Sequence, residues 1–161
     1  MPRRKSVNLI RNVGKDALYN DELVQKMTNI IMEQGKKNAA RTIVNTAMEL
    51  LGRKGGGGPE KALRLLYKAI EQITPFVEVQ SKRVGGSVYQ VPTEVSAHRA
   101  RSLALRWLKH AAAQRSDKTM GERLGYELFQ ASEGQGAAVK KKVDVHKMAE
   151  ANRAFAHYSW K

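Results

Sequence analysis

Apolar residues recur at helical spacing along most of the chain and predict about six helices. Three of them precede residue 75, and the first begins after Asp21, a favourable N-cap, and ends by Gly35. The second is expected over residues 38–51. The third begins at Pro59, because proline suits the first turn of a helix. The apolar positions share one side of each helical wheel, so each helix is expected to bury one face.

Three further helices are expected in the second half of the chain. The longest covers about residues 93–115, and the sequence Thr119-Met120-Gly121-Glu122 forms a capping box for the next one. That fifth helix should end near Ser132, before two glycines. Asp144 is the expected N-cap of a last helix that reaches about Tyr158.

Between about residues 76 and 91 the pattern changes to the alternation of β-strands. Val77 and Val79 alternate with polar residues, and a second extended run follows Gly85-Gly86 and is closed by Pro92. Two such runs around paired glycines predict a β-hairpin. An isolated two-stranded ribbon is marginal in water, so it should lean on the helices or be ordered by a ligand. The predicted fold is mainly α, a single domain of about six helices with one protruding β-hairpin.

The charge of the chain indicates its kind of partner. The 161 residues include 29 Lys and Arg against 15 Asp and Glu, which leaves a formal net charge of +14. An excess of this size repels itself and points to a polyanion. Residues 1–15 contain no acid and predict a flexible basic arm, and residues 16–161 predict the helical domain. No membrane partner and no secretory signal are expected, because charges interrupt every apolar stretch.

The long helix predicted over residues 93–115 carries the most informative charge pattern. One sector of its surface, beside the apolar stripe that includes Trp107, holds only basic side chains: Arg99, Arg106, Lys109 and His110. No acid occurs in this helix between Val95 and Ser116. A solvated face usually mixes both signs, so this sector is expected to lie along phosphates, where neutralisation releases counterions. A merely soluble basic face is the alternative.

Three other basic segments add weaker signals. Lys82 and Arg83 precede the hairpin turn, where Gly85-Gly86 permit positive φ and close backbone approach; a structural hairpin with a solubilising tip is the alternative. Tyr89 on the return strand either packs on the helices or stacks on a base. Two short basic runs are equally compatible with solvation or targeting: Arg3-Arg4-Lys5 and Lys140-Lys141-Lys142.

Catalytic and metal sites are not indicated. The glycines at 55–58 join two helices and lack the Lys-Ser/Thr of a phosphate-binding loop. His98 and His146 each lie four residues from a glutamate without a third ligand, so no metal and no cofactor are predicted. The chain has no cysteine, which excludes disulfides and thiolate sites. Three kinds of protein with a polyanionic partner stay open: a structural RNA-binding protein, a DNA-binding architectural protein and an RNA-modifying enzyme.

Two long motifs resemble the family of small-subunit ribosomal protein seven, of bacterial or organellar type. The first is EVQSKRVGGSVYQVPTEV at residues 78–95. The second is AVKKK at 138–142, followed by Asp144, His146 and MAEANRAFAHY at 148–158. Arg106-Trp107-Leu108 and Gly35-Lys36-Lys37 fit the same family, and the match spans nearly the whole chain in order.

This resemblance implies a structural, non-enzymatic component of the small ribosomal subunit. Members of the family have a helical domain with a protruding β-hairpin, bind the 3′ major domain of the ribosomal RNA and nucleate assembly of the subunit head. The hairpin is expected near the exit-site tRNA and the mRNA exit channel, with ribosomal proteins nine and eleven as neighbours. The location is then the cytoplasm, in the ribosome, or the matrix or stroma of an organelle.

The resemblance also implies which residues face the RNA. Combined with the basic sector and segments above, the predicted ribosomal RNA-binding set is Arg3, Arg4, Lys5, Lys36, Lys37, Lys82, Arg83, Arg99, Arg101, Arg106, Lys109, Lys140, Lys141 and Lys142. The expected hairpin tip near the tRNA is Arg83, Val84, Gly85 and Gly86. Arg101 comes from the resemblance alone and lies away from the basic sector, so the RNA would have to wrap further round the helix.

Overall fold

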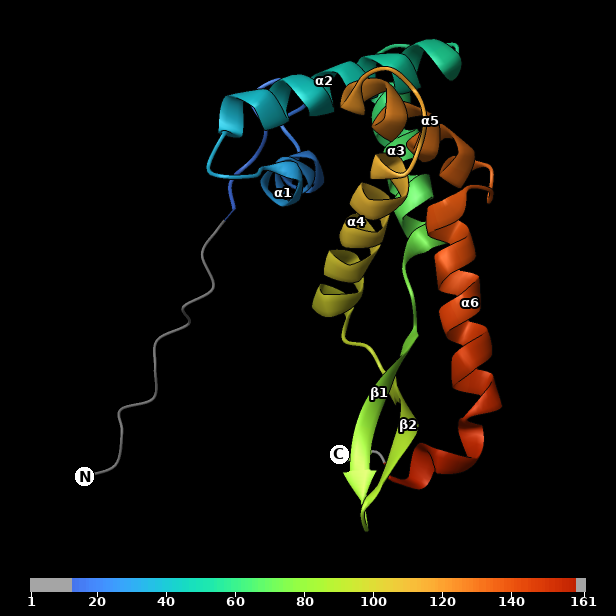
Figure 1. The fold of residues 1–161 in the computed structure, drawn as a ribbon. Coiled ribbons are helices and arrows are strands. Elements are labelled where there is room, and N and C mark those ends of the chain that lie inside the picture. The colour runs from blue at the N-terminus through green and yellow to red at the C-terminus, as the bar shows by residue number, and fades with distance from the viewer. Residues whose placement is uncertain (1–12, 159–161) are drawn as a thin grey trace, which may run out of the picture.

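The fold consists of a bundle of helices at one end and an extension, formed by the hairpin and the last helix, at the other (Figure 1). It was obtained as a computed structural model that describes residues 13–158. The elements follow in the order α1 (Glu22–Ile31), α2 (Lys37–Lys54), α3 (Pro59–Ile73), β1 (Val77–Val84), β2 (Ser87–Glu94), α4 (Ala97–Ala113), α5 (Met120–Ser132), α6 (Ala137–Ala151) and the 3-10 helix η1 (Arg153–Tyr158). The predicted mainly α fold with one hairpin is confirmed.

Local signals in the sequence set the starts of several helices. The Asp21 carboxylate accepts hydrogen bonds from the backbone N–H of Leu23 (2.8 Å) and Val24 (3.1 Å), as an N-cap does. The predicted capping box between Thr119 and Glu122 is present at α5. The end of α1 was predicted less well, because the helix stops at Ile31 and the chain turns through residues 32–36 before α2.

Helix α5 is the centre of the bundle and packs against α2, α3 and α4. Two glycines bring it close to α2. A Cβ placed on Gly121 would lie 2.9 Å from the Thr46 side chain, and one on Gly125 would lie 3.1 Å from the Ala47 carbonyl oxygen. This close approach seals a core that contains Leu51, Leu66, Leu108, Leu124 and Leu128, each at most 1% exposed.

The hairpin pairs β1 with β2 around the turn at Gly85 and Gly86. Both glycines have positive φ (+56° and +90°), as the tight turns preferred by hairpins require. Pro92 does not close the second strand as predicted, because β2 continues to Glu94 with Pro92 opposite Val79. In a two-stranded sheet each strand is an edge, so proline's missing N–H can face outward. Consequently α4 begins at Ala97 and not near residue 93.

The start of α6 also corrects the sequence prediction. The helix begins at Ala137, so Asp144 lies inside it, and it ends at Ala151 before the separate η1. Its first turn is capped from another helix: the Ala138 N–H donates to Oε1 of Glu127 (2.9 Å), a carboxylate on α5 that is 1% exposed. Oε2 of Glu127 lies 3.1 Å from Arg115 Nη1. This buried network fixes the direction in which α6 leaves the bundle.

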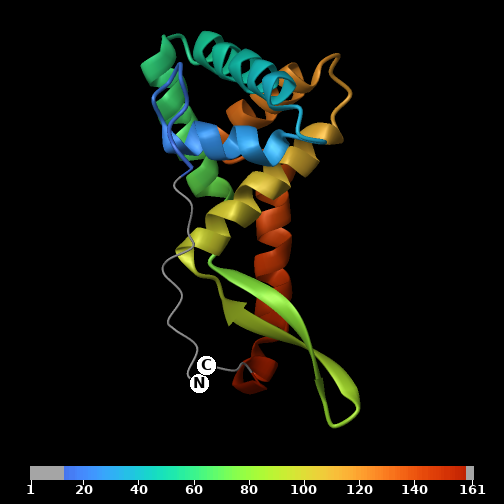
Figure 2. The same cartoon turned by 90° about the vertical axis from the view of Figure 1, so that its left-hand side faces the viewer.

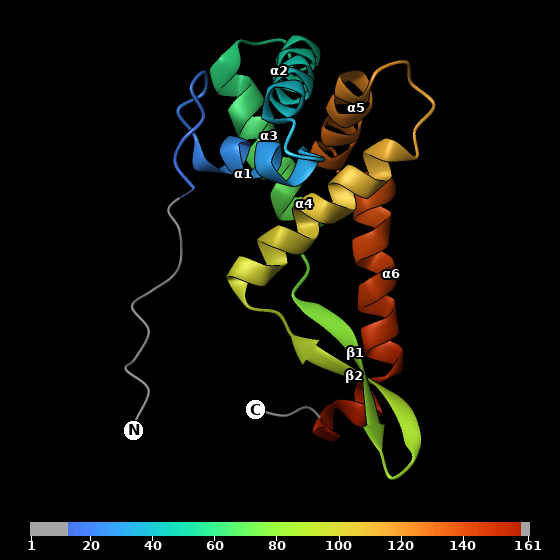
Figure 3. The ribbon, with the colours of Figure 1, turned by 60° about the vertical axis from the view of Figure 1, so that its left-hand side comes forward.

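The hairpin leans on α6 and η1, as expected for a two-stranded ribbon, and its tip projects beyond them (Figures 2 and 3). Tyr89 packs on the rings of Phe155 and Tyr158, with ring centroids 5.1 Å and 5.5 Å away. Of the two readings of Tyr89, packing within the protein is therefore the one that the structure supports. Trp160, two residues after Tyr158 in the sequence, lies outside the described residues.

Candidate nucleic-acid interface

A groove of about 620 Å³ between α4 and α6 gathers cations that are far apart in the sequence. Arg106 and His110 line it from α4, and Lys140 and Lys141 line it from α6. Because α6 starts earlier than predicted, the lysine run is held on a helix and not in a loop. Trp107 is half-buried in the same groove. Asp144 also lines the groove from α6, so the groove combines an excess of rigidly held positive charge with an aromatic surface.

The same surface continues towards the start of α2. A hollow of about 260 Å³ is lined by Lys36 and Lys109, and a shallow depression lined by Lys109, Arg106 and His110 joins it to the groove. We call this continuous surface the cationic track; its members are Lys36, Lys109, Arg106, His110, Lys140 and Lys141. It therefore unites the turn before α2 with α4 and α6.

Two cations of the basic sector of α4 form ion pairs with glutamates from other elements. This corrects the sequence interpretation, which considered only the acids within the helix. Lys109 Nζ lies 2.8 Å from Glu33 Oε1, in the turn after α1, and Arg99 Nε lies 2.9 Å from Glu78 Oε1, on β1. Hydrogen bonds from these cations lower the pKa of both glutamates. Arg99 therefore also ties the hairpin to α4.

Other members of the track are not engaged in this way. In the part of the chain from residue 13 to 158, no ion pair involves Arg106, Lys140 or Lys141. All three side chains are exposed. Their charge is consequently available to a polyanion.

Lys142 and Arg101 are two of the predicted RNA-binding residues that do not belong to the track. Lys142 Nζ donates to the Gln72 carbonyl oxygen (2.8 Å) near the end of α3, and burial lowers the pKa of this lysine. It therefore joins α6 to α3. Arg101 lies on another side of α4, in a hollow that also contains Glu22 and Tyr67.

The two predicted cations of the hairpin, Lys82 and Arg83, have different surroundings. Lys82 is half-buried and donates to the Tyr158 carbonyl oxygen (3.3 Å), so it helps to hold η1. Arg83 and the two tip glycines are exposed, and Val84 is half-buried. Lys37 is exposed at the start of α2. The predicted arm residues Arg3, Arg4 and Lys5 lie outside the described residues.

The two histidine-glutamate pairs, at residues 94/98 and 146/150, have no third metal-ligating side chain beside them in the described structure. Among residues 13–158 no group of three or more His, Asp or Glu side chains is arranged to hold a metal ion. His146 has a structural contact, because its Nε2 accepts a hydrogen bond from the Phe76 N–H (3.3 Å). Burial and the nearby charge of Lys142 lower the pKa of His146. The described helices also include none with the length and apolar character of a membrane span.

Trp107 is a functional candidate that the helical pattern did not identify. The helical wheel puts it in the apolar stripe, whereas in the structure it lines the groove beside Arg106. The signal that could have found it is its spacing from His110, since residues three apart are neighbours on a helix surface. Trp107 therefore lies on the border between the core and the basic sector.

Fold and surface together define a helical protein that presents a continuous basic surface and a protruding hairpin, the features of a nucleic-acid-binding protein. A family model described as "Ribosomal protein S7p/S5e" matches residues 2–153. The chain belongs to this family.

Curated relatives agree over the full length of the chain. A protein of Syntrophotalea carbinolica is 52% identical over 160 residues, which cover 99% of this chain and all of the relative. Proteins of Nautilia profundicola and Vibrio campbellii are 50% and 48% identical over the same shares of both chains. Each of the three is named "Small ribosomal subunit protein uS7".

Membership in this family confirms the class of protein expected from the resemblance. The chain is a structural, ribosomal RNA-binding component of the small ribosomal subunit, located with the ribosome in the cytoplasm, and is not an enzyme. The RNA-modifying enzyme and the DNA-binding architectural protein are thereby set aside.

Proposed function

We propose that the chain binds the 3′ major domain of the small-subunit ribosomal RNA directly and nucleates assembly of the subunit head. The observation that carries this proposal is the cationic track, which presents charges from α4, α6 and the turn before α2 on one rigid surface. Each phosphate neutralised there releases counterions, which favours binding. A surface that spans several elements contacts several RNA helices at once, as a protein that gathers an RNA junction must.

The shape of the track supports folded RNA as the partner. The largest of its hollows by volume is the groove with the half-buried Trp107 in its wall, next to Arg106. Proteins recognise folded RNA through its shape and through unpaired bases that stack on aromatic rings and guanidinium planes. A groove that combines cations with an indole suits such an RNA better than the regular backbone of a duplex.

The hairpin has a separate part in the proposal. We assign its tip, Arg83 to Gly86, to the neighbourhood of the exit-site tRNA and the mRNA exit channel, with ribosomal proteins nine and eleven nearby. The tip projects beyond η1, and its two glycines present backbone without side chains (Figure 3). The basic arm at residues 1–15 would add phosphate contacts through Arg3, Arg4 and Lys5 to those of the helical domain at 16–161.

Chemical footprinting of small-subunit RNA with and without the chain tests this assignment. Protection is expected in the 3′ major domain and should weaken for Arg106→Glu combined with Lys140→Glu. The matched control is Lys61→Glu with Lys68→Glu, an equal charge change on exposed positions of α3 outside the track. Protection confined to another domain, or equal losses for both double variants, would contradict the proposal.

The hairpin assignment needs its own readout. Arg83→Glu is expected to leave the affinity for free small-subunit RNA nearly unchanged, because Arg83 lies outside the track. In assembled subunits the same change should weaken occupancy of the exit site by tRNA. Loss of affinity for the free RNA would show that the hairpin makes a principal contact in it.

A further inference from the structure

A second hollow, of about 670 Å³, lies between α1, α3 and α4 and shares no lining residue with the groove of the cationic track. We propose that this hollow is a pocket for one unpaired nucleobase of the RNA. The proposal rests on the proposed function, since the track would bring the RNA backbone to α4. The base pocket would give Arg101, which lies away from the basic sector, a part in RNA binding that is separate from the track.

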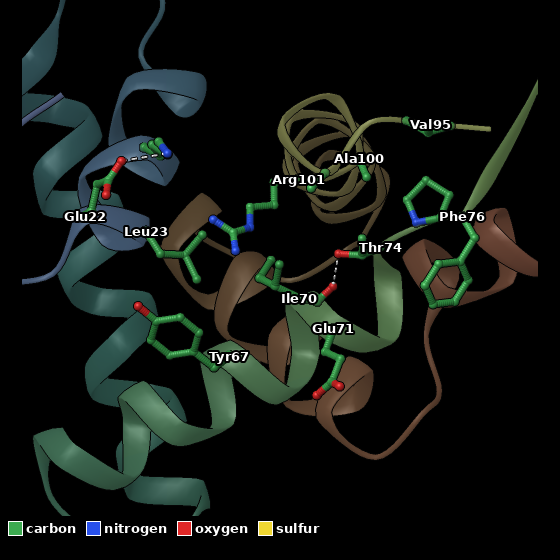
Figure 4. A pocket seen from close by; sticks show the side chains of 13 residues that line it. Glu22, Leu23, Tyr67, Ile70, Glu71, Thr74, Phe76, Val95, Ala100 and Arg101 are labelled. Atoms are coloured by element: carbon green, nitrogen blue, oxygen red, sulfur yellow. Dashed lines mark hydrogen bonds and ion pairs between the residues drawn. The ribbon is translucent and has the colours of Figure 1, made fainter. Parts of the chain in front are cut away.

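The walls of the hollow suit a flat, uncharged ring. Leu23 and Ile70 form apolar surface, and the Tyr67 side chain, in a residue that is 51% exposed, borders the same space (Figure 4). The Arg101 side chain extends from α4 towards Leu23 and Ile70 (Figure 4). Aromatic rings and guanidinium planes are the surfaces on which RNA-binding proteins stack unpaired bases.

Tyr67 is held in place before any ligand arrives. Its hydroxyl donates to Asp21 Oδ2 at 2.6 Å, while Oδ1 of the same carboxylate caps α1. The hydrogen bond to Asp21, together with burial, raises the pKa of Tyr67 to about 12, because the phenol has to keep its proton to donate this bond. A ring that is already ordered loses little conformational entropy on binding.

The charges around the hollow favour a base over a phosphate. Glu22 and Glu71 line it, and Lys26 is engaged by Glu22 at 2.7 Å, which leaves Arg101 as the cation without an ion pair among the lining residues described. Because Glu22 is paired with Lys26, a phosphate would meet the carboxylate of Glu71, whereas a base offers N–H groups to a carboxylate and acceptor atoms to a guanidinium. A basic peptide is the rival occupant, and the Arg101 charge opposes it.

The test uses a short oligoribonucleotide in which a single 2-aminopurine is the only base and every other position is abasic. The full chain is expected to bind it about tenfold more tightly than the same backbone with no base, with quenching of the 2-aminopurine fluorescence by stacking. Tyr67→Leu, which keeps apolar volume, and Arg101→Gln should each bring this ratio of affinities towards one. Arg106→Glu should weaken both oligomers equally and leave the ratio unchanged.

The possible failures are distinguishable. Equal affinity of the two oligomers, with both still weakened by Arg106→Glu, would overturn the base pocket and leave the track intact. A ratio that survives while Arg106→Glu has no effect would support the pocket and contradict the proposed role of the track. A change in the NMR signals of the Tyr67 ring with tetra-arginine and none with either oligomer would assign the hollow to a basic protein segment and overturn the proposal.

Discussion

Leu66 and Leu128 are completely buried in the helical bundle, whereas of strand residues 77–94 only Val91 is buried. The bundle core is one cluster of apolar side chains from α1 to α5, extended by the start of α6. The hairpin is joined to the rest of the molecule by a few separate contacts. These include the ion pair of Arg99 with Glu78 and the tilted ring contact of Tyr89 with Phe155.

The two regions therefore obtain their shape from different forces. Apolar burial amounts to about 1.5–3 kcal/mol for each fully buried large side chain and depends little on salt or pH. Exposed ion pairs contribute roughly 1 kcal/mol or less each and weaken with salt, and aromatic pairs contribute about 0.5–1.5 kcal/mol each. We therefore expect the hairpin to open at a lower free energy than the bundle.

The largest expected effect is on the bundle. Leu128→Ala removes a side chain with no exposed surface at the centre of the core and should destabilise the chain by about 2–5 kcal/mol. Urea unfolding followed by circular dichroism measures this loss. Val88→Ala, at a position that is 65% exposed on the hairpin, is the control and should change stability by less than about 0.5 kcal/mol. Similar losses for both would remove the distinction between the regions.

Charge reversal on the bundle surface should affect binding without affecting folding. Arg106→Glu is expected to weaken RNA binding about tenfold or more at about 0.1 M salt and to lower the slope of affinity against salt by about one. The melting temperature should stay nearly constant, because Arg106 is exposed and makes no ion pair in the described residues. A large fall in the melting temperature would instead show that Arg106 stabilises the fold.

Arg99→Glu makes the same change of charge at the junction with the hairpin. Because Arg99 Nε contacts both oxygens of Glu78, at 2.9 and 3.0 Å, the new carboxylate would face an existing one. We expect faster hydrogen exchange in β1 for Arg99→Glu and unchanged exchange for Arg106→Glu. Equal exchange in both variants would show that this ion pair does not hold the hairpin.

Tyr89→Ala should loosen the hairpin and leave the bundle as it is. The two ring contacts of Tyr89 with η1 are each of a kind that contributes about 0.5–1.5 kcal/mol. The amides of β2 should therefore exchange faster, while those of α5 keep their protection. Tyr89→Phe, which retains the ring, should restore protection of β2. Uniform loss of protection across the molecule would indicate that hairpin and bundle unfold together.

The smallest expected effect is a pH dependence at the root of the hairpin. The pKa of His146 is lowered by burial and by Lys142, so the unfolded chain binds more protons than the folded one between that lowered value and about 6.5. The contribution of neutral His146, which accepts from the Phe76 N–H, is present above about 6.5 and is lost as pH falls through the folded pKa. The amide proton shift of Phe76 should follow this titration.

His146→Gln is the control for that titration, since glutamine offers an acceptor that does not gain a proton near neutral pH. The Phe76 shift should then lose its pH dependence between about 5 and 7. An unchanged titration in the variant would place the sensitive group elsewhere.

Much of the fold was predictable because its signals are local. Asp21, Pro59 and the Thr119 capping box start helices through contacts within one turn, and Gly85-Gly86 permit the hairpin turn through their own backbone. The start of α6 was not predictable in this way. Its cap comes from Glu127 on α5, which lies eleven residues earlier than Ala138.

In the candidate site, too, the local features were predictable and the contacts between elements were not. That α4 carries a basic sector follows from its spacing, but the partners of Lys109 and Arg99 come from other elements, at Glu33 and Glu78. Likewise, Lys142 belongs to a basic run in the sequence, yet its ammonium group caps a carbonyl of α3. Helical periodicity describes one element at a time and contains no information on what lies opposite it.

The amino-acid sequence by itself determined the helices, the hairpin, the excess of positive charge and the family, because each depends on neighbouring residues or on an ordered set of motifs. Only the tertiary structure decided that Arg106 and Lys140 share a groove while Arg101 borders a separate hollow. The physical reason is that packing of the apolar faces sets which outer surfaces become neighbours, and those neighbours are far apart along the chain.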